Sequence, residues 1–321
     1  MKLKYWTKGK GIGGKIKSPE DFVVREIIDK KFLRKYSIKK IIEEPEKYQL
    51  VLIRKRNITT KDAVRILSNF YKIPQSSFGS QSFGYAGLKD KFSVSFQYLT
   101  VKSKVEKINL GNIEVIEIRK TDKFLSPGDL IANEFEITLH GCSGSPEKAI
   151  EEIERCGMPN FFGPQRFGKH GNNHVIGKLL LKRKFDKALD LIDEKYKNLK
   201  DIPKDILKFY VHAYQSWLFN SALDEYVSKE KRPYFKEVKI PGYKTELGHN
   251  RIEKSMQKML EKDKIKISDF MINELRMSSN GAKRAAFIKV KIRYEKINGT
   301  KLCFTLPKGS YATALLKEIT K

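Results

Sequence analysis

The sequence predicts an α+β fold, because strand-like segments occur near both ends of the chain and a helical region separates them. Strand periodicity recurs through the first 157 residues and returns after residue 286, whereas helical spacing dominates between these points. We therefore predict a mixed core built from residues 1–157 and 286–321, interrupted by a largely helical insertion over residues 158–285.

The first part of the chain contains several strand-like segments and one well-marked helix. Thr59, followed three residues later by Asp62, is typical of a helix N-terminus, and the apolar residues that follow share one helical face. Residues 92–98 alternate apolar side chains with Ser and Gln, so the apolar side of this strand is predicted to be buried. The other predicted strands here are residues 48–53, 113–118 and 135–139.

The rest of the chain is predicted to be richer in helices. Ser145 as N-cap, Pro146 at the first helical position and Gly157 as terminator define a short helix. Further helices are predicted over residues 186–196, 204–227 and 312–319, and strands over residues 286–294 and 302–306.

The charge balance predicts a polyanionic partner. The 321 residues include 65 Lys and Arg against 38 Asp and Glu, a formal net charge of +27, and 40% of the residues are hydrophobic. Such a chain folds, which excludes the disordered class, and a basic excess in a folded protein favours nucleic-acid binding. A Lys- and Glu-rich surface of the thermophile type would explain the number of charges but not their sign.

Other composition features exclude several classes of protein. The cysteines at 142, 156 and 303 lack metal-ligand spacing, so we expect neither a disulfide partner nor a metal site. The sequence has no signal-like start and no apolar run that could span a bilayer. We therefore expect a cytoplasmic protein without membrane contact, and a monomer.

Two motif-like patterns carry little weight. Residues 9–15 satisfy GxxxxGK, but Ile16 stands where a P-loop needs Ser or Thr, so a flexible cationic loop is favoured over nucleotide binding. His170 and His174 have metal-like spacing, but the Gly-Asn-Asn between them is a poor helix and no third ligand is near. We interpret both histidines as solvated or RNA-facing.

One carboxylate stands out. Asp90 lies in a glycine-punctuated turn just before a predicted strand, and the ammonium groups of Lys89 and Lys91 favour its ionised form. Such a carboxylate can serve as nucleophile or general base. The alternative is a turn aspartate that bonds its own backbone.

Six stretches, in order along the chain, resemble the TruD family of tRNA pseudouridine synthases. Among them is a GxKD motif, whose aspartate is the catalytic residue of that family and corresponds to Asp90. The stretches are residues 19–26 (PEDFVVRE), 87–90 (GLKD), 133–135 (NEF), 159–168 (PNFFGPQRFG), 213–220 (AYQSWLFN) and 306–313 (LPKGSYAT).

The resemblance implies a pseudouridine synthase core around a mixed, mainly antiparallel sheet, with a family-specific insertion domain. It implies an isomerase that converts a tRNA uridine, position 13 in the D-arm region, to pseudouridine. It also implies that tRNA is the partner and that no cofactor is needed. The competing hypothesis is a tRNA-binding protein or RNA chaperone without catalysis.

The resemblance also implies further site residues. Lys17 and Glu26 resemble the active-site lysine and glutamate of the family; Lys17 could pair with Asp90, and Lys15 is the alternative lysine. Asn133 would orient the Asp90 loop or a base edge. Phe135 would stack on the uracil, although its place in an alternating strand also suits core packing.

Basic and aromatic groups elsewhere are expected at the RNA. Lys89 is expected to bind the substrate. Gln165, Arg166 and Phe167 combine donors with an aromatic ring, a set suited to RNA backbone and an extruded nucleotide. The alternative for these three is a hinge contact between domains.

Overall fold

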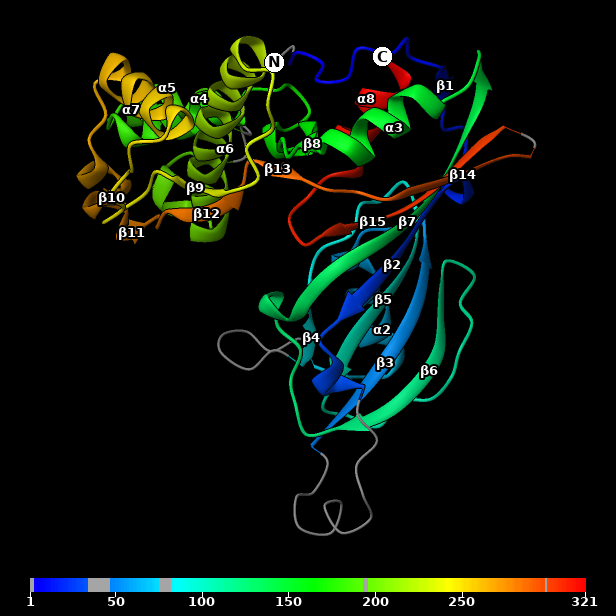
Figure 1. Cartoon of the computed structure of the whole chain (residues 1–321). Helices are drawn as coiled ribbons and strands as arrows, with labels where there is room; N and C mark the ends of the chain where they lie inside the picture. Colours follow the sequence, from blue (N-terminus) through cyan, green and yellow to red (C-terminus); the bar gives the residue numbers. More distant parts are fainter. Residues whose placement is uncertain (1–2, 34–46, 75–81, 193–195, 298) are drawn as a thin grey trace. The chain divides into compact units, whose positions relative to one another are not determined.

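A computed structural model describes residues 3–33, 47–74, 82–192, 196–297 and 299–321 (Figure 1). The chain forms two compact units. The sheet unit comprises Gly13–Gly144 and Lys291–Gly309, and the helical unit comprises Met1–Ile12, Ser145–Val290 and Ser310–Lys321. Among the described residues, no helix has the length and apolar character that a bilayer span requires.

The sheet unit is built around a nine-stranded sheet. Its main path runs β14-β15-β7-β2-β5-β3-β6, with β1 paired to β7 and β4 paired to β5. Strands β2 and β5 run parallel, and the other paired strands run antiparallel, so the prediction of an α+β fold with a mixed, mainly antiparallel sheet is confirmed. The strands are β1 (Gly13–Lys15), β2 (Phe22–Ile28), β3 (Tyr48–Arg56), β4 (Phe83–Tyr85), β5 (Val94–Val101), β6 (Ile113–Thr121), β7 (Leu130–Cys142), β14 (Ile292–Lys296) and β15 (Thr300–Pro307).

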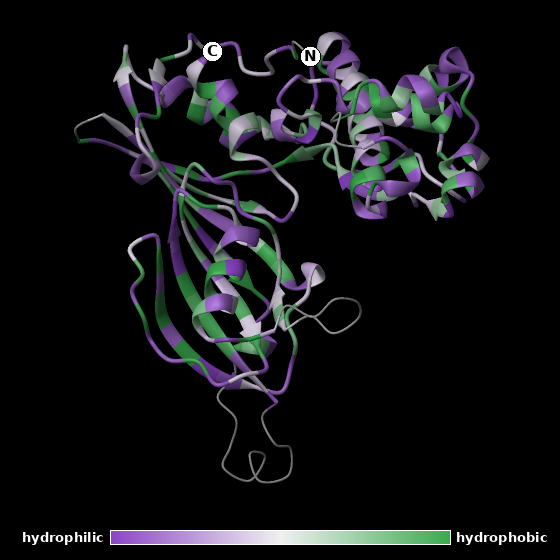
Figure 2. Cartoon of the chain, turned by 180° about the vertical axis from the view of Figure 1, so that it is seen from behind, coloured by the Kyte–Doolittle hydropathy of each residue, from purple (hydrophilic) through white to green (hydrophobic). Residues whose placement is uncertain are grey.

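Helix α2 (Thr60–Phe70) packs on this sheet. Its start is the predicted one, because the Thr59 hydroxyl accepts a hydrogen bond from the Asp62 backbone N–H at 3.1 Å. Ala63 and Leu67 of the helix join a core cluster with residues of β3, β5 and β6. Figure 2 shows hydrophobic and hydrophilic residues alternating along the strands, as expected for a sheet with one covered face.

Strand β5 differs from its prediction. Its apolar side was predicted to be buried, but Phe92 is 50% exposed and Ser93, Ser95 and Gln97 are almost completely buried. The polar residues face inward because they meet buried polar partners: the Ser93 and Ser95 hydroxyls lie 2.8 Å apart, and Thr60 donates to Gln97. This buried polar face supports the candidate site.

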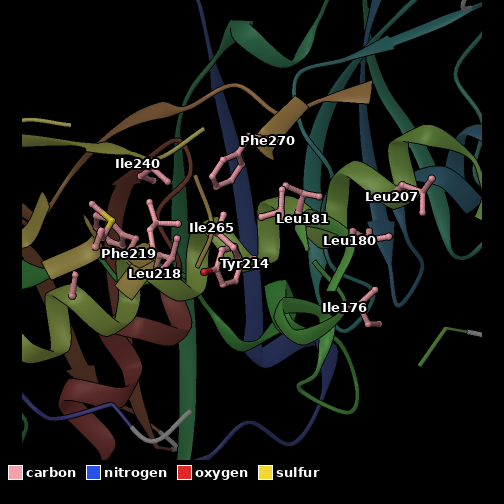
Figure 3. Close-up of a cluster of buried hydrophobic side chains, with 14 of the residues drawn as sticks. Ile176, Leu180, Leu181, Leu207, Tyr214, Leu218, Phe219, Ile240, Ile265 and Phe270 are labelled. Atoms are coloured by element: carbon pink, nitrogen blue, oxygen red, sulfur yellow. The ribbon is translucent and has the colours of Figure 1, made fainter. Parts of the chain in front are cut away.

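The helical unit has one large apolar core (Figure 3). The long helix α6 supplies Tyr214, Leu218 and Phe219, which are fully buried among apolar residues of the surrounding helices. The helices are α3 (Glu147–Cys156), α4 (Asn173–Leu181), α5 (Phe185–Leu189), α6 (Lys204–Lys229), α7 (Arg251–Asp263) and α8 (Ala312–Thr320). The strands are β8 (Met158–Pro159), β9 (Glu237–Ile240), β10 (Met271–Ile272), β11 (Met277–Ser278), β12 (Ala282–Ala285) and β13 (Phe287–Ile288).

Some element boundaries differ from the prediction. Helix α3 has Pro146 rather than Ser145 at its N-cap, and it ends, as predicted, at Gly157, whose φ of 70° suits glycine. Helix α5 ends at Leu189, short of the predicted residue 196; residues 193–195 lie outside the described part of the chain. The strand predicted over 286–294 is divided into β13 and β14, which belong to different units.

The boundaries of the compact units differ from the domain boundaries predicted after residues 157 and 285. The N-terminal segment belongs to the helical unit because it is bonded to α8: the Glu318 carboxylate accepts the Trp6 and Thr7 backbone N–H groups at 3.0 and 2.9 Å. The Ile12 backbone N–H donates to the Ile319 carbonyl at 3.0 Å. Residues 6–12 therefore pack against the last helix of the chain.

Candidate active site

The predicted loop 87–90 lies against the sheet, between β4 and β5. Two buried polar residues face it from neighbouring strands, since Glu26 of β2 lies directly beside Asn133 of β7 in the strand register. A third buried polar residue, Gln97 of β5, is 3.4 Å from Glu26. The strand pairing therefore creates a polar row in an otherwise apolar sheet face.

Lys89 is anchored to this row by its side chain. Its Nζ lies 2.6 Å from Glu26 Oε1 and donates to Asn133 Oδ1 at 2.8 Å. Burial raises the pKa of the Glu26 carboxyl, and the adjacent Lys89 ammonium opposes that shift. The second Glu26 oxygen accepts the Tyr98 backbone N–H at 3.0 Å, which fixes the carboxylate to β5.

Gln97 and Thr60 hold the loop backbone. Gln97 Nε2 donates to the Gly87 carbonyl at 2.6 Å, and the Thr60 hydroxyl donates to Gln97 Oε1 at 2.9 Å. The Thr60 oxygen in turn accepts the Lys89 backbone N–H at 2.9 Å. The start of helix α2 and strand β5 thus fix the backbone on both sides of Leu88.

Lys55 of β3 holds the end of the loop. Its buried Nζ donates to the carbonyl of Asp90 at 2.9 Å and to that of Ile58 at 2.6 Å. The Ser93 hydroxyl also donates to the Asp90 carbonyl, at 3.1 Å. Burial lowers the pKa of Lys55 to about 8, although the nearby Asp90 charge partly restores it.

The Asp90 carboxylate itself is exposed and has no hydrogen bond or ion pair within the described part of the chain. Its backbone is fixed while its side chain stays available, which differs from a turn aspartate engaged with its own backbone. Leu88 and Phe92, on either side of it, are 61% and 50% exposed. The arrangement presents a positioned carboxylate flanked by apolar groups, as a nucleophile or general base requires.

Phe135 occupies the same face as Asn133 but is buried. Its ring stacks on Phe304 with centroids 5.3 Å apart and meets the edge of Phe22 at 6.1 Å. The side chain therefore contributes to the core, the alternative considered for it above. In the described part of the chain, the Phe135 ring contacts other phenylalanine rings.

The structure does not bring Lys17 to Asp90. The Lys17 side chain is exposed and forms no ion pair among the described residues, and its backbone N–H donates to Asp21 at 2.9 Å. Asp21 contacts His140, toward the end of β7 away from Asn133, so this segment runs away from the loop. Lys15 is exposed in β1, also opposite His140. Lys55 bonds the Asp90 carbonyl instead, and Lys89, which belongs to the loop, bonds Asn133.

Gln165, Arg166 and Phe167 lie in a single 3-10 turn (Pro164–Phe167) of the helical unit. Gln165 is exposed, and the Phe167 ring meets the edge of His174 at 5.7 Å. The Arg166 guanidinium lies 5.6 Å from the centroid of the Phe162 ring.

The other two sequence patterns have structural roles. The end of the GxxxxGK stretch forms β1 and pairs with β7, and is not the start of a helix. His174 stacks on Trp217 with centroids 5.7 Å apart. No group of three or more metal-ligating side chains exists among the residues that the structure describes.

Sequence reasoning missed Lys55, Thr60 and Gln97. A signal was present, because Lys55 interrupts the apolar pattern of β3 and Gln97 follows Ser93 and Ser95 on one strand face. Buried polar residues that recur with strand periodicity indicate a polar partner on that face, here the loop 87–90.

Comparison with known proteins places the chain in a family. Residues 2–199 and 227–319 match the family described as tRNA pseudouridine synthase D (TruD). The chain is 28% identical to the tRNA pseudouridine synthase D of Aquifex aeolicus, with 94% of this chain and 96% of that protein aligned. It is 28% identical to a protein of Pyrococcus abyssi named as a probable tRNA pseudouridine synthase D, over 99% of both.

A solved structure from Methanosarcina mazei, titled as that of a "putative tRNA pseudouridine synthase D", shares the fold. It superposes with a TM-score of 0.71 at 24% identity and covers 99% of this chain and 95% of that one. The family match extends over far more than half of the residues and includes the Asp90 loop and the strands that hold it. The chain belongs to the tRNA pseudouridine synthase D (TruD) family.

Proposed function

We propose that this protein converts a uridine of tRNA to pseudouridine, with Asp90 as the catalytic carboxylate. The observation that carries the proposal is a contrast within one residue. The Asp90 carbonyl accepts hydrogen bonds from Lys55 and Ser93, while its exposed carboxylate has no hydrogen bond or ion pair among the residues that the structure describes. A carboxylate held in this way loses little conformational freedom when substrate binds.

The reaction is an isomerisation in which atoms are conserved. The bond between N1 of uracil and C1′ of the ribose breaks, the base turns while bound, and C5 joins C1′; the proton on C5 leaves and N1 gains one. Asp90 serves either as nucleophile at the sugar or as a base that generates a glycal-like intermediate. Both routes use the ionised form, which also stabilises positive charge that develops at the ribose.

Glu26, Lys89 and Asn133 act in this proposal as positioning residues. Their polar atoms bond to one another and to the sheet: Lys89 Nζ lies 2.6 Å from Glu26 and 2.8 Å from Asn133. Their role is to hold the loop so that Asp90 faces the substrate. Gln97, Thr60 and Lys55 extend the same support along the loop backbone.

The substrate is proposed to be tRNA, and the target uridine position 13 of the D-arm region. The net charge of +27 supports a polyanionic substrate, and the relatives described above are named as synthases acting on tRNA. The target base must leave its stack before a carboxylate can reach the sugar. Exposed Leu88 and Phe92 provide apolar surface beside Asp90 for such a base.

The test is incubation of the purified full-length chain with unmodified tRNA transcripts, followed by nucleoside analysis and site mapping. We expect pseudouridine at position 13, none in a transcript with cytidine there, and none with Asp90→Asn. Asp201→Asn, an equal charge change at an exposed aspartate, should keep full activity.

Two results would overturn parts of the proposal. Pseudouridine formed at normal rate by Asp90→Asn would remove that residue from the chemistry. Salt-dependent tRNA binding by a folded wild-type protein that forms no pseudouridine in any transcript would favour the competing hypothesis of a non-catalytic binding protein.

A further inference from the structure

Three sequence motifs that the proposed reaction does not use meet within the helical unit, around the ring of Phe162. The Asn220 side chain accepts the Phe162 backbone N–H at 2.8 Å and donates to its carbonyl at 3.0 Å. The Phe162 ring lies 6.1 Å from that of Tyr311. Residues of the stretches 159–168 and 213–220 and the part of the third stretch that belongs to the helical unit, residues 310–313, therefore form one cluster.

Gly163 allows the turn that carries Arg166 to lie directly against the start of α8. A Cβ at this position would lie 2.5 Å from Tyr311 Cδ1 and 2.9 Å from Thr313 Oγ1. The Arg166 backbone N–H donates back to the Gly163 carbonyl at 3.1 Å. Arg166 is thus held beside the residues that open α8.

Positive charge is concentrated here. The guanidinium groups of Arg284 and Arg166 lie 3.9 and 5.6 Å from the centroid of the same Phe162 ring. Burial and the neighbouring Arg166 lower the pKa of Arg284 to about 10, and Tyr311 opposes that shift. Burial, Arg166 and Lys208 lower the pKa of His212 to about 4. The two charged groups that act on His212 are both cations.

The cluster also contains unused hydrogen-bond donors. Arg166 Nε, Ser310 Oγ and Thr313 Oγ1 are buried and have no hydrogen-bond partner in the described part of the chain. Each of these three groups can donate, and the arginine can only donate. Buried donors without acceptors are costly, and an anion with several oxygens supplies acceptors that also attract the positive charge of the arginine.

We propose that Arg166, Ser310 and Thr313 form a binding site for one phosphodiester group of an RNA backbone. The identity of that RNA as tRNA rests on the proposed function. A phosphodiester fits better than a base edge, because the site offers donors and positive charge together. The Phe162 ring lies under the Arg166 guanidinium and contacts the Tyr311 ring, so it forms the apolar base of the site.

The test measures tRNA affinity of the full-length chain as a function of salt, with Asp90→Asn as the parent so that the substrate is not converted. Adding Arg166→Gln should weaken binding about tenfold, the effect of one lost charge-assisted hydrogen bond, and reduce the salt slope by about one. Thr313→Val, which keeps side-chain shape, should weaken binding several-fold without changing that slope.

Lys262→Gln is the charge-matched control, since Lys262 is exposed on α7. Unchanged affinity and slope in both Arg166→Gln and Thr313→Val would overturn the site. Equal losses in Lys262→Gln and Arg166→Gln would also overturn it, because the effect would then be one of net charge.

Free phosphate is the other source of the same chemistry. We expect melting temperatures in phosphate and in chloride of equal ionic strength to shift equally for wild type and Arg166→Gln. A phosphate-specific stabilisation that requires Arg166, without any change in tRNA affinity, would assign the site to a small anion. Wild-type protein that forms no pseudouridine but binds tRNA through Arg166 would refute the proposed function and keep this site.

Discussion

Lys89 and Glu26 form a buried ion pair 2.6 Å apart, with side-chain exposures of 7% and 0%. A charge removed from water is costly unless it is paired and hydrogen-bonded, and here both groups have further partners, Asn133 for the lysine and Tyr98 for the glutamate. The pair joins the loop before Asp90 to strand β2.

Breaking this pair from one side should destabilise the protein strongly. Glu26→Ala leaves the Lys89 ammonium buried without its counter-charge, so we expect a loss of about 3–5 kcal/mol in the free energy of unfolding. Chemical denaturation followed by circular dichroism measures this loss of stability. As a control, Lys229→Met removes an exposed ion pair with Glu225 and should cost less than about 1 kcal/mol of unfolding free energy. Similar losses of stability in the two variants would contradict a special role of the buried pair.

Lys55 should give the reaction an alkaline limit. The pKa of Lys55 is about 8, so its ammonium, which holds the Asp90 carbonyl, loses its charge above that pH. We expect kcat to fall as pH rises through about 8 in the wild type. In Lys55→Arg the charge persists above pH 8, so any residual activity should not fall in this pH range. If kcat of that variant still falls through pH 8, another group is responsible for the titration.

The same group makes a prediction for stability. The pKa of Lys55 is lower in the folded protein than the ordinary 10.5, so the unfolded chain binds the proton more tightly. Between about pH 8 and 10.5, this residue therefore makes the folded state more stable as pH rises. Comparing unfolding free energies of wild type and Lys55→Met at pH 8 and 10 isolates the effect; a difference that is independent of pH would refute the shift.

Substitution of Phe135 should affect stability before it affects the reaction. Its ring is 6% exposed and packs on Phe304 and Phe22, so Phe135→Ala should cost about 3–5 kcal/mol of unfolding free energy. Phe135→Leu, which keeps much of the volume, should cost about 1 kcal/mol and retain most activity. A stable Phe135→Leu protein whose kcat falls a hundredfold would instead show that the ring acts on the substrate base.

Much of the sheet could be predicted from the sequence, because periodicity decides which residues form a strand. The pairing of strands could not, since the contact of Glu26 with residues 97 and 98 depends on β2 and β5 lying side by side. The inward orientation of Gln97 also depends on the loop that covers it. The order of motifs predicted Asp90 as the candidate catalytic residue, but the identity of the lysines around it required the fold.

Strand β7 ends at Cys142, and the strand that completes its pairing on one side, β15, begins only at Thr300. During synthesis at about 5–20 residues per second, roughly 150 residues must emerge before that edge is covered, a delay on the order of ten to thirty seconds. The intervening segment Ser145–Val290 contains all the buried residues of the apolar core of the helical unit, so this core can form in the interval, whereas Phe135 waits for Phe304. The nascent chain therefore carries an open strand edge, which exposes it to aggregation before β15 has been synthesised.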